Sequence, residues 1–243
     1  DRYDSMALKQ VSDNFFDKDN GSSSYPLPFR APYLRYEEWH IEFIDNNNKV
    51  LEIGAGTGIH THSLLETGAF VIATDISPNS VKIIKKKYKK YADKLIAKVA
   101  DMENLPFDSK TFDVVSIAGS LSYGDNNKVI NEIYRILKPG GKLIIVDSLH
   151  ENPIYVINRW VGYFKGIRSL STIKQMPTLK LIRKYENKFN LKKLDFFGSI
   201  TWLSPILNLF LKKEIVGKFL DKFDALINVR RSAFKFVVVF YKK

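Results

Sequence analysis

Cysteine is absent from the 243 residues of the chain. This absence excludes a disulfide framework, a zinc-thiolate site, an iron–sulfur cluster and a cysteine nucleophile. The sequence also lacks an apolar run close to the roughly 20 residues of a membrane span. Residues 1–10 lack the basic-then-apolar order of a secretory signal peptide. We therefore expect a cytoplasmic protein that is either soluble or peripheral to a membrane.

Acidic residues are scarce in the second part of the chain, where residues 151–243 hold 19 Lys and Arg against 6 Asp and Glu. Residues 1–150 hold 19 basic and 20 acidic residues, so the two parts carry +13 and −1, and the whole chain carries +12. This asymmetry predicts a surface for an anionic acceptor, a phospholipid or a nucleic acid. A compositional drift toward solvated lysines is the alternative, and the sequence leaves both open.

The composition is that of a globular protein, since 45% of the residues are hydrophobic and 26% are charged. These values exclude the disordered, collagen-like and coiled-coil classes. Residues 1–33 are polar and rich in Ser and Pro, so we expect a lead-in segment or lid there. We expect a single domain over residues 34–243, which opens with a helix over 34–46.

Short apolar runs alternate with amphipathic helical stretches between residues 49 and 147. This alternation is typical of a parallel sheet wrapped by helices, a doubly wound α/β fold. The expected strands cover 49–53, 70–74, 95–99, 112–117 and 142–147. The expected helices cover about 59–67, 78–91 and 128–137, and the last is expected to end in Lys138-Pro139-Gly140-Gly141.

The pattern changes after residue 150 to mixed aromatic and basic stretches. We expect strands over 191–197 and 234–241, with a helical block over about 205–227 between them. Residues 202–213 are apolar and then basic, which predicts either a helix lying in a membrane interface or a helix packed on the core.

A glycine-rich turn, Glu52-Ile53-Gly54-Ala55-Gly56-Thr57-Gly58, is the sharpest signal of function. Glycines let the backbone approach a ligand, and the helix that follows offers free N–H groups to a nucleotide-like molecule. The dinucleotide pattern requires glycine at position 59, which is Ile59. Glu52 would repel a pyrophosphate and attract an ammonium group, and Asp75 is placed to accept both hydroxyls of a ribose. The expected ligand is therefore zwitterionic and free of phosphate.

These motifs resemble those of the class I S-adenosylmethionine-dependent methyltransferases, closely over roughly residues 34–147. The glycine-rich turn resembles the nucleotide-binding motif of that family, and Asp75 resembles its ribose-binding acid. Residues 100–107 resemble the adenine-binding segment, and residues 112–117 the fourth-strand motif. Residues 137–143 resemble the turn before the fifth strand. Motifs in the family's order are together far more specific than any one of them.

The resemblance implies a seven-stranded, mostly parallel sheet whose last strand, 234–241, runs antiparallel beside 191–197. It implies acceptor-cap insertions at about 150–190 and 199–232. The implied cofactor is S-adenosyl-L-methionine, with S-adenosyl-L-homocysteine as the product. The implied cofactor-binding residues are Glu52, Gly54, Ala55, Gly56, Gly58, Asp75, Ile76, Asp101, Met102, Ala118, Gly119 and Ser120.

The acceptor is expected beyond the carboxyl ends of the strands, near residues 120–123 and 147–152. His150 is the first candidate for a catalytic base, because an ordinary histidine pKa of about 6.5 suits proton transfer at neutral pH, and Tyr123 is the second. The stretch from His150 resembles methyltransferases of cell-envelope glycans, glycolipids and quinones. That likeness implies anchors for a phosphate or carboxylate of the acceptor at Asn152, Arg159, Arg168, Arg230 and Arg231.

No metal is expected, because His60 and His62 are two residues apart on a helix and point in different directions. The predicted function is methyl transfer to a small-molecule, sugar or lipid-linked acceptor, with contact to a membrane surface as a further expectation. RNA is the alternative acceptor, suggested by the charge of +13, although no Asn-Pro-Pro-Tyr or Asp-Pro-Pro-Tyr tetrapeptide follows the fourth strand. A nicotinamide-dependent oxidoreductase or a non-catalytic nucleotide-binding protein is the alternative of another class.

Overall fold

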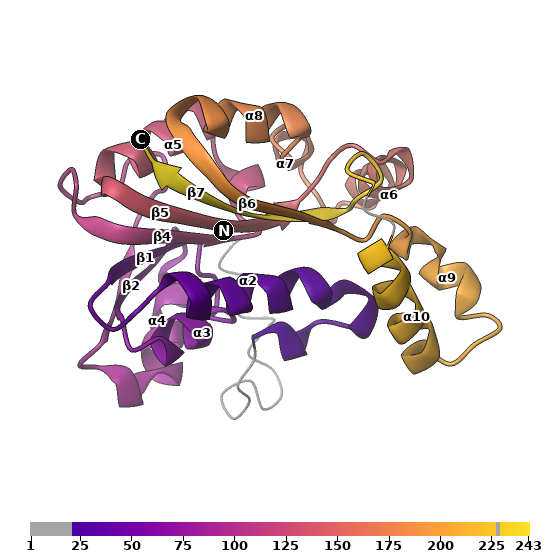
Figure 1. The fold of residues 1–243 in the computed structure, drawn as a ribbon, viewed down its shortest axis with the longest axis horizontal. Coiled ribbons are helices and arrows are strands. Elements are labelled where there is room, and N and C mark those ends of the chain that lie inside the picture. Colours follow the sequence, from indigo (N-terminus) through magenta and orange to yellow (C-terminus); the bar gives the residue numbers. More distant parts are fainter. Residues whose placement is uncertain (1–20, 227–228) are drawn as a thin grey trace.

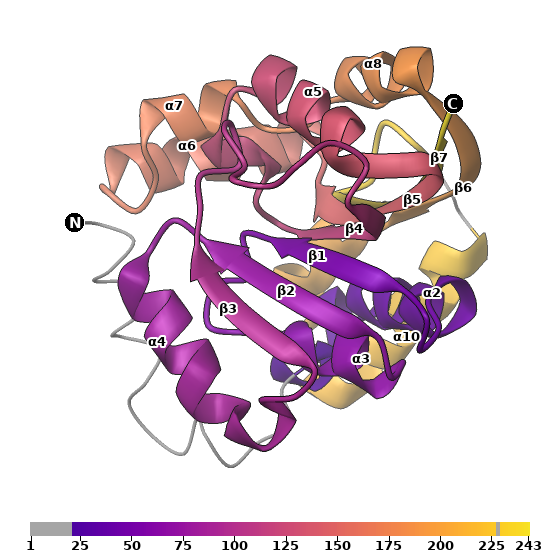
Figure 2. The same cartoon turned by 90° about the vertical axis from the view of Figure 1, so that its left-hand side faces the viewer.

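A single seven-stranded sheet runs through the molecule (Figures 1 and 2). The computed structural model describes residues 21–226 and 229–243 of the chain. The strand order is β3-β2-β1-β4-β5-β7-β6, and β7 is antiparallel to both of its neighbours. The strands are β1 (Lys49–Ile53), β2 (Phe70–Asp75), β3 (Leu95–Val99), β4 (Phe112–Ala118), β5 (Leu137–Ser148), β6 (Phe189–Phe197) and β7 (Lys235–Lys242).

Helices cover both faces of this sheet (Figure 1). One face carries α2 (Ala31–Phe43), α3 (Thr61–Glu66) and α4 (Pro78–Lys87), and the other carries α5 (Asn126–Ile136) and α8 (Leu179–Lys188). The remaining α-helices of the described ranges are α6 (Pro153–Phe164), α7 (Leu170–Lys174), α9 (Ser204–Leu207) and α10 (Lys213–Leu226). Short 3-10 helices are η1 (Ser22–Ser24), η2 (Leu27–Phe29), η3 (Lys89–Tyr91), η4 (Leu121–Tyr123) and η5 (Thr201–Leu203).

The predicted doubly wound α/β fold with an antiparallel last strand is confirmed. Alternation along β4 explains why the sheet needs both layers. Val115 and Ile117 pack into the core under α5 and α8, whereas Val114 packs into the core under α2, α3 and α4. Because successive side chains of a strand point to opposite faces, a strand that is apolar throughout is stable only when both faces are covered.

Several predicted boundaries differ from the structure by a few residues, and two of these differences have a clear physical reason. The first helix begins at Ala31 and ends at Phe43, earlier than 34–46, because Pro32 is tolerated in the first turn, where helical N–H groups have no partner. The helix before β5 ends at Ile136, and residues 138–141 belong to β5 as a bulge. Phe112 of β4 pairs with Leu137 of β5, but the next paired residue, Val114, lies opposite Lys142. Residues 138–141 therefore have no partner on β4.

The structure contains helices that the sequence analysis did not identify. The stretch described as mixed aromatic and basic forms α6, α7 and α8. The helical block expected over 205–227 is interrupted between α9 and α10, and residues 227–228 lie outside the described residues. Residues 1–20 of the expected lead-in segment also lie outside them, while residues 21–30 carry η1 and η2.

A buried polar network joins α2 to the sheet. The Ser116 Oγ of β4 lies 2.6 Å from the Tyr36 hydroxyl and 2.8 Å from His40 Nε2. The Nδ1 of His40 lies 2.8 Å from Ser63 Oγ, which itself donates to the carbonyl of His60. A neutral imidazole satisfies this chain of hydrogen bonds when Nδ1 donates and Nε2 accepts. Burial accordingly lowers the pKa of His40 well below its ordinary value.

Replacement of His40 tests this network. Because the folded-state pKa lies below the unfolded value of about 6.5, the neutral ring stabilises the fold above that pH, and the contribution is lost as the pH falls. The unfolding free energy of the wild type minus that of His40→Gln should shrink between pH 7.5 and 5, by up to about 1.4 kcal/mol per pH unit. Urea titrations of both proteins at several pH values measure this difference in unfolding free energy. Ser63→Ala should keep the wild-type slope, and a difference that does not vary with pH would contradict the assignment.

Candidate functional site

The turn after β1 lies directly against the end of β4. Gly54, Gly56 and Gly58 all have positive φ, at 65°, 55° and 80°. A Cβ atom on Gly54 would lie 2.6 Å from the Cβ and Oγ of Ser120, closer than any side chain allows. Glycine is therefore required at position 54 for both its backbone conformation and the close packing.

Asp75 links this turn to the end of β2. Its Oδ2 accepts a hydrogen bond of 2.8 Å from the backbone N–H of Gly56, and its Oδ1 accepts one of 2.9 Å from the N–H of Ser77. The cap of α4 is a different residue, because Ser77 Oγ accepts from the N–H of Ser80. A carboxylate has about four acceptor positions, so Asp75 retains capacity for further donors.

A cavity of about 190 Å³ lies at the carboxyl ends of β1, β2 and β4. Most of the residues predicted to bind the cofactor line it, together with Tyr123: Gly54, Gly56, Asp75, Ile76, Asp101, Met102, Ala118, Gly119 and Ser120. Ile53 and Ala100 also line it and were not identified from the sequence. The predicted residues Glu52, Ala55 and Gly58 are not among the residues that line this cavity. Their predicted roles stay predictions.

The loop that carries Asp101 is held by α5. Asp101 Oδ1 accepts from the N–H of Glu103, which forms a tight turn. The Glu103 carboxylate accepts from the N–H of Asp125 and pairs with Lys128 at 3.0 Å. Glu132 Oε2 accepts from the N–H of Leu105 farther along the same loop. The exposed carboxylate of Asp101 is thereby fixed at the rim of the small cavity.

Glu52 is buried next to the cavity, and 2% of its surface is exposed. Its Oε2 accepts a hydrogen bond of 2.6 Å from the Thr61 hydroxyl. Burial, with a smaller contribution from the negative charge of Asp75, raises the pKa of Glu52 to about 8 although the hydrogen bond from Thr61 opposes the change. The carboxyl group is therefore mostly protonated at neutral pH, and a cation close by would favour its ionised form.

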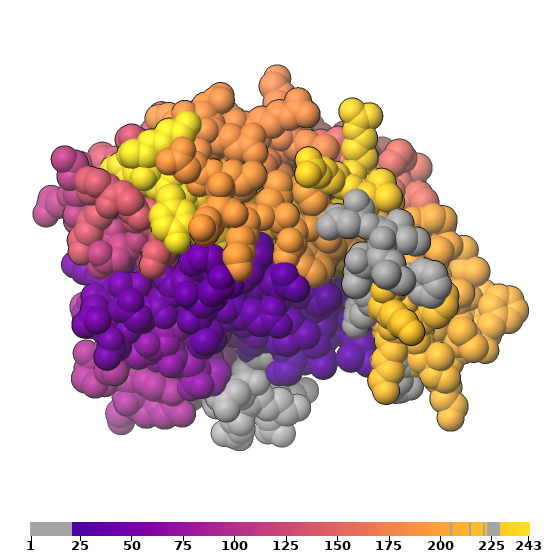
Figure 3. Space-filling view, in the orientation of Figure 1, coloured from indigo at the N-terminus to yellow at the C-terminus, as the bar shows by residue number. Residues whose placement is uncertain are grey.

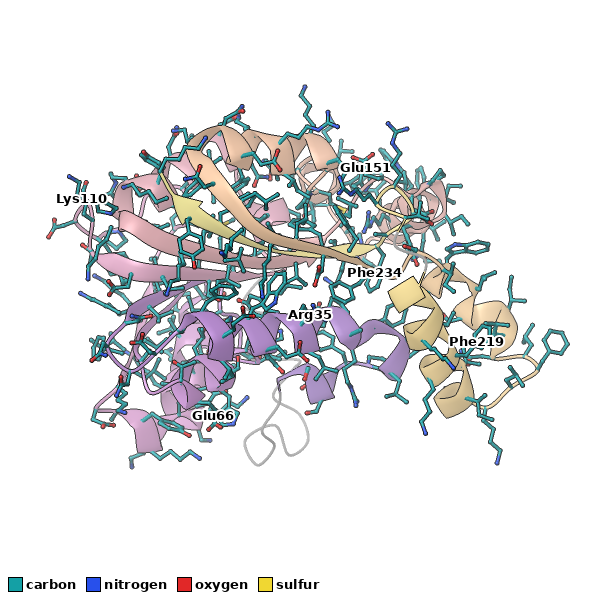
Figure 4. All side chains as sticks on the ribbon, in the orientation of Figure 1. Arg35, Glu66, Lys110, Glu151, Phe219 and Phe234 are labelled. Atoms are coloured by element: carbon teal, nitrogen blue, oxygen red, sulfur yellow. The ribbon has the colours of Figure 1, made fainter. Side chains whose placement is uncertain are left out.

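A larger cavity of about 610 Å³ lies beside the ends of β5 and β7. It is lined by aromatic rings, polar side chains and three cationic residues. The lining residues are Tyr25, Phe29, Tyr33, Ser148, Ile154, Tyr155, Asn158, Arg159, Arg168, Thr201, Trp202, Ser204, Phe234 and Lys235. Phe234, labelled in Figure 4, lies where the end of the sheet meets the helices of the C-terminal part. Its ring packs edge-on against Phe29, with centroids 5.3 Å apart.

Lys235 supplies a buried cation to the large cavity, and the sequence analysis missed it. Its Nζ lies 3.5 Å from Ser148 Oγ and 4.8 Å from the centre of the Tyr33 ring. Burial lowers the pKa of Lys235 and raises that of Asp147, while the attraction between the two groups opposes both changes. A lysine within the otherwise apolar run Phe234 to Tyr241 is the signal that marks it, because an unpaired lysine is almost never buried.

Hydrogen bonds connect the region around Lys235 with the small cavity. Asp147 Oδ2 accepts from the N–H of Leu121, the residue after Ser120. On the other side, the Tyr25 and Tyr33 rings stack at 3.6 Å, and the Tyr25 hydroxyl lies 3.2 Å from His60 Nε2. His60 follows the glycine-rich turn by two residues. These hydrogen bonds link the surroundings of the two cavities, which lie at the same edge of the sheet and have no lining residue in common.

The two predicted catalytic residues occupy different positions. Tyr123 lines the small cavity, and its ring is exposed. The Nδ1 of His150 lies 3.0 Å from a guanidinium nitrogen of Arg159, which also donates to the carbonyl of Leu149. Burial, followed by the charge of Arg159, lowers the pKa of His150. Because Arg159 can only donate, this contact occupies the lone pair that a base would use, and the role of His150 stays a prediction.

The predicted acceptor-binding residues do not all lie together. Arg159 and Arg168 line the large cavity, and burial lowers the pKa of Arg159 to about 10. Asn152 is buried, caps α6 through the N–H of Ile154 and donates to the carbonyl of Ser232. Arg230 lies over the Phe196 ring, and Arg231 is exposed. The roles of these residues, like the predicted absence of a metal, stay predictions.

Comparisons with known proteins identify the fold and the domain. Residues 51–145 match the family model described as a methyltransferase domain. The chain is 33% identical over 139 residues to a sterol 4-C-methyltransferase of Caenorhabditis elegans. The aligned region is 56% of this chain and 41% of that protein. It is 28% identical over 141 residues to a demethylmenaquinone methyltransferase of Clavibacter sepedonicus, covering 58% of this chain and 57% of that protein. The chain thus spans about half the length of these relatives.

A solved structure extends the likeness over the whole fold. The geranyl diphosphate C-methyltransferase of Streptomyces coelicolor A3(2) matches 98% of this chain and 88% of its own, with a TM-score of 0.65 and 14% identity. At that identity the likeness concerns the fold alone. Residues 51–145 thus match a methyltransferase domain, and the chain has the fold of the class I S-adenosylmethionine-dependent methyltransferases.

Proposed function

We propose that this protein transfers a methyl group from S-adenosylmethionine to a small molecule that has a large apolar part and an anionic group. The observation that carries the proposal is the pair of cavities at the same edge of the sheet, one lined by most of the predicted cofactor-binding residues and one lined by aromatic rings and cations. The names of the two curated relatives refer to a sterol and to demethylmenaquinone, which are predominantly apolar molecules. Sugar or lipid-linked acceptors belong to the same proposal.

The residues of the small cavity fit S-adenosylmethionine. Gly54, Gly56 and Gly119 have left-handed backbone conformations, and a Cβ at Gly56 or Gly119 would meet no atom within 4 Å, so these turns leave room for a ligand. Asp75 and Asp101 line this cavity, so their carboxylates would accept hydrogen bonds from the hydroxyl and amine groups of a bound nucleoside. Buried Glu52 offers a negative charge to an ammonium group when it ionises.

When bound, this cofactor supplies a methyl group on a sulfonium, which an acceptor atom takes by in-line displacement at carbon while S-adenosylhomocysteine leaves. The chain then has to hold the acceptor in line and exclude water. The stacked rings of Tyr25 and Tyr33 form an apolar wall for it. Lys235, Arg159 and Arg168 favour the form of the acceptor whose acidic oxygen or carbon atom has lost its proton to solvent, and this anionic form is the better nucleophile.

Labelled methyl transfer tests this function. The protein is incubated with methyl-labelled S-adenosylmethionine and an extract of the source organism, which is then separated into lipid, small-molecule, nucleic-acid and protein pools. We expect label in the lipid or small-molecule pool. Lys235→Met should reduce this label at least tenfold and leave the affinity for S-adenosylhomocysteine unchanged, because Lys235 lines only the acceptor cavity.

Lys193→Met, which removes a lysine paired with Glu42 on the surface, is the matched control and should keep full activity. Label confined to nucleic acid would replace the proposed acceptor with RNA. Binding of S-adenosylhomocysteine without label in any pool would favour a non-catalytic nucleotide-binding protein.

The contribution of Asp75 is measured by calorimetry with S-adenosylhomocysteine. Asp75→Ala removes an acceptor of ribose hydroxyl groups, and each charged hydrogen bond lost costs about 1.5–3 kcal/mol, so we expect affinity to fall at least about tenfold. Ser77→Ala is the control, since it removes the cap of α4 and leaves the Asp75 carboxylate in place. An affinity of Asp75→Ala equal to that of the wild type would exclude the ribose assignment.

The raised pKa of Glu52 predicts a pH dependence of binding. Glu52 is mostly protonated below its pKa of about 8, and an ammonium group bound nearby lowers that pKa, so binding releases a proton. The affinity for S-adenosylhomocysteine should therefore rise between pH 6.5 and 8.5. Calorimetry in buffers of different ionisation enthalpy counts the proton. Glu52→Gln should release no such proton on binding. Glu66→Gln, which changes an exposed residue of α3, should release it as the wild type does. Equal proton release by all three proteins would refute the role of Glu52.

A further inference from the structure

The outward face of α6 is apolar. Ile157, Trp160, Val161 and Phe164 are all exposed, Phe164 to 80% of its surface. Their spacing of three and four residues places them on one face of the helix, and the buried Arg159 points the other way. A helix that packs on a core normally turns its polar face to water, so the polarity of α6 is inverted.

A second exposed apolar group lies on α9 and the segment that follows it. Ile206, Leu209, Phe210 and Leu211 are exposed, Leu209 to 78% and Phe210 to 80%. Lys212 and Lys213 follow them directly and are also exposed. In Figure 3 the α9 and α10 region forms the right-hand end of the molecule, beyond the sheet. These four residues and the four of α6 are called the apolar rim below.

Other residues of α6 and of the segment around α9 line the large cavity. On α6, the cavity is lined by Ile154, Tyr155 and Asn158. On the other side it is lined by Thr201 and Trp202 of η5, and by Ser204 at the start of α9. In Figure 1, α6 and α9 lie at the same end of the molecule.

The charge around the apolar rim is positive. The 34 residues from Asn152 to Tyr185 include seven Lys and Arg and no Asp or Glu. Lys165, Lys174 and Lys180 among them are exposed. Trp160 and Tyr163, whose rings meet edge-on at 5.8 Å, are amphipathic side chains of the kind found at the level of lipid headgroups. No helix in the described ranges combines the length and the apolar character needed to cross a bilayer.

We propose that the apolar rim docks the protein on the surface of an anionic lipid bilayer, with the basic side chains against the headgroups. An exposed apolar face flanked by lysines binds such a surface through both buried area and charge. The proposal rests on the proposed function in one respect: docking on a bilayer would bring the protein to a source of the apolar acceptor.

Sedimentation with vesicles tests the docking surface directly. The full chain is mixed with vesicles of phosphatidylcholine alone or of phosphatidylcholine and phosphatidylglycerol in equal parts. We expect strong binding to the anionic vesicles, weaker binding to the neutral ones, and a decrease with added salt. Phe164→Glu and Phe210→Glu should each lower the affinity at least tenfold. Ile41→Glu, which puts the same charge on an exposed isoleucine of α2, should bind as the wild type does.

Tryptophan fluorescence gives a second measurement on the folded protein. Trp39 is buried and Trp202 lines the cavity, so Trp160 is the tryptophan that lies on the apolar rim. Anionic vesicles should shift the emission to shorter wavelength, and Trp160→Phe should lose most of that shift. This measurement remains available if a charged variant does not fold.

The outcomes separate the two proposals. Calorimetry with S-adenosylhomocysteine is run on the same proteins, because cofactor binding needs no membrane. Absence of vesicle binding together with normal cofactor binding would overturn the docking proposal and leave the proposed function intact. Vesicle binding without cofactor binding would support the docking proposal and overturn the proposed function. A concentration-dependent dimer in the absence of lipid that Phe164→Glu dissociates would assign the apolar rim to a second copy of the chain and overturn the lipid proposal.

Discussion

The contact between the turn after β1 and the end of β4 constrains the rest of the site. β1 and β4 are neighbours at the point where the strand order reverses, so their connections leave toward opposite faces and a crevice opens beyond their carboxyl ends. Gly54 allows the turn to lie against Ser120, and Asp75 at the end of β2 fixes the turn through the N–H of Gly56. The small cavity has its shape because these three strand ends meet without a side chain between them.

Burial of charge relates the two cavities. Asp147 accepts from the backbone next to the small cavity, while Lys235 and Arg159 lie at the large one. Burial lowers the pKa of both cations and raises that of Asp147, and the attraction of each cation for Asp147 opposes those changes. An anion bound in the large cavity would compensate the remaining positive charge. In the function that we propose, these groups lie between the bound cofactor and the bound acceptor.

The sequence predicted the elements whose pattern is local. The strand at 49–53 and the strand at 95–99 were predicted to the residue, because each is a short apolar run bounded by turns. Most of the predicted cofactor residues line one cavity, since parallel strands bring their carboxyl ends to the same edge. α6 and α8 were missed. The apolar face of α6 points outward and its buried residue is Arg159, so its pattern does not show which side faces the core, and the basic side chains of α8 masked its buried Ile182 and Tyr185.

By itself the sequence determined the order of strands and helices, the glycine-rich turn and the acids after β2 and β3, because these depend on residues close together in the chain. Only the tertiary structure decided what surrounds the acceptor. Tyr25 and Lys235 are separated by 210 positions and line one cavity because β7 inserts between β5 and β6. The pairing of His150 with Arg159 was decided in the same way. Such contacts depend on how whole elements pack, and no local pattern of residue types records that packing.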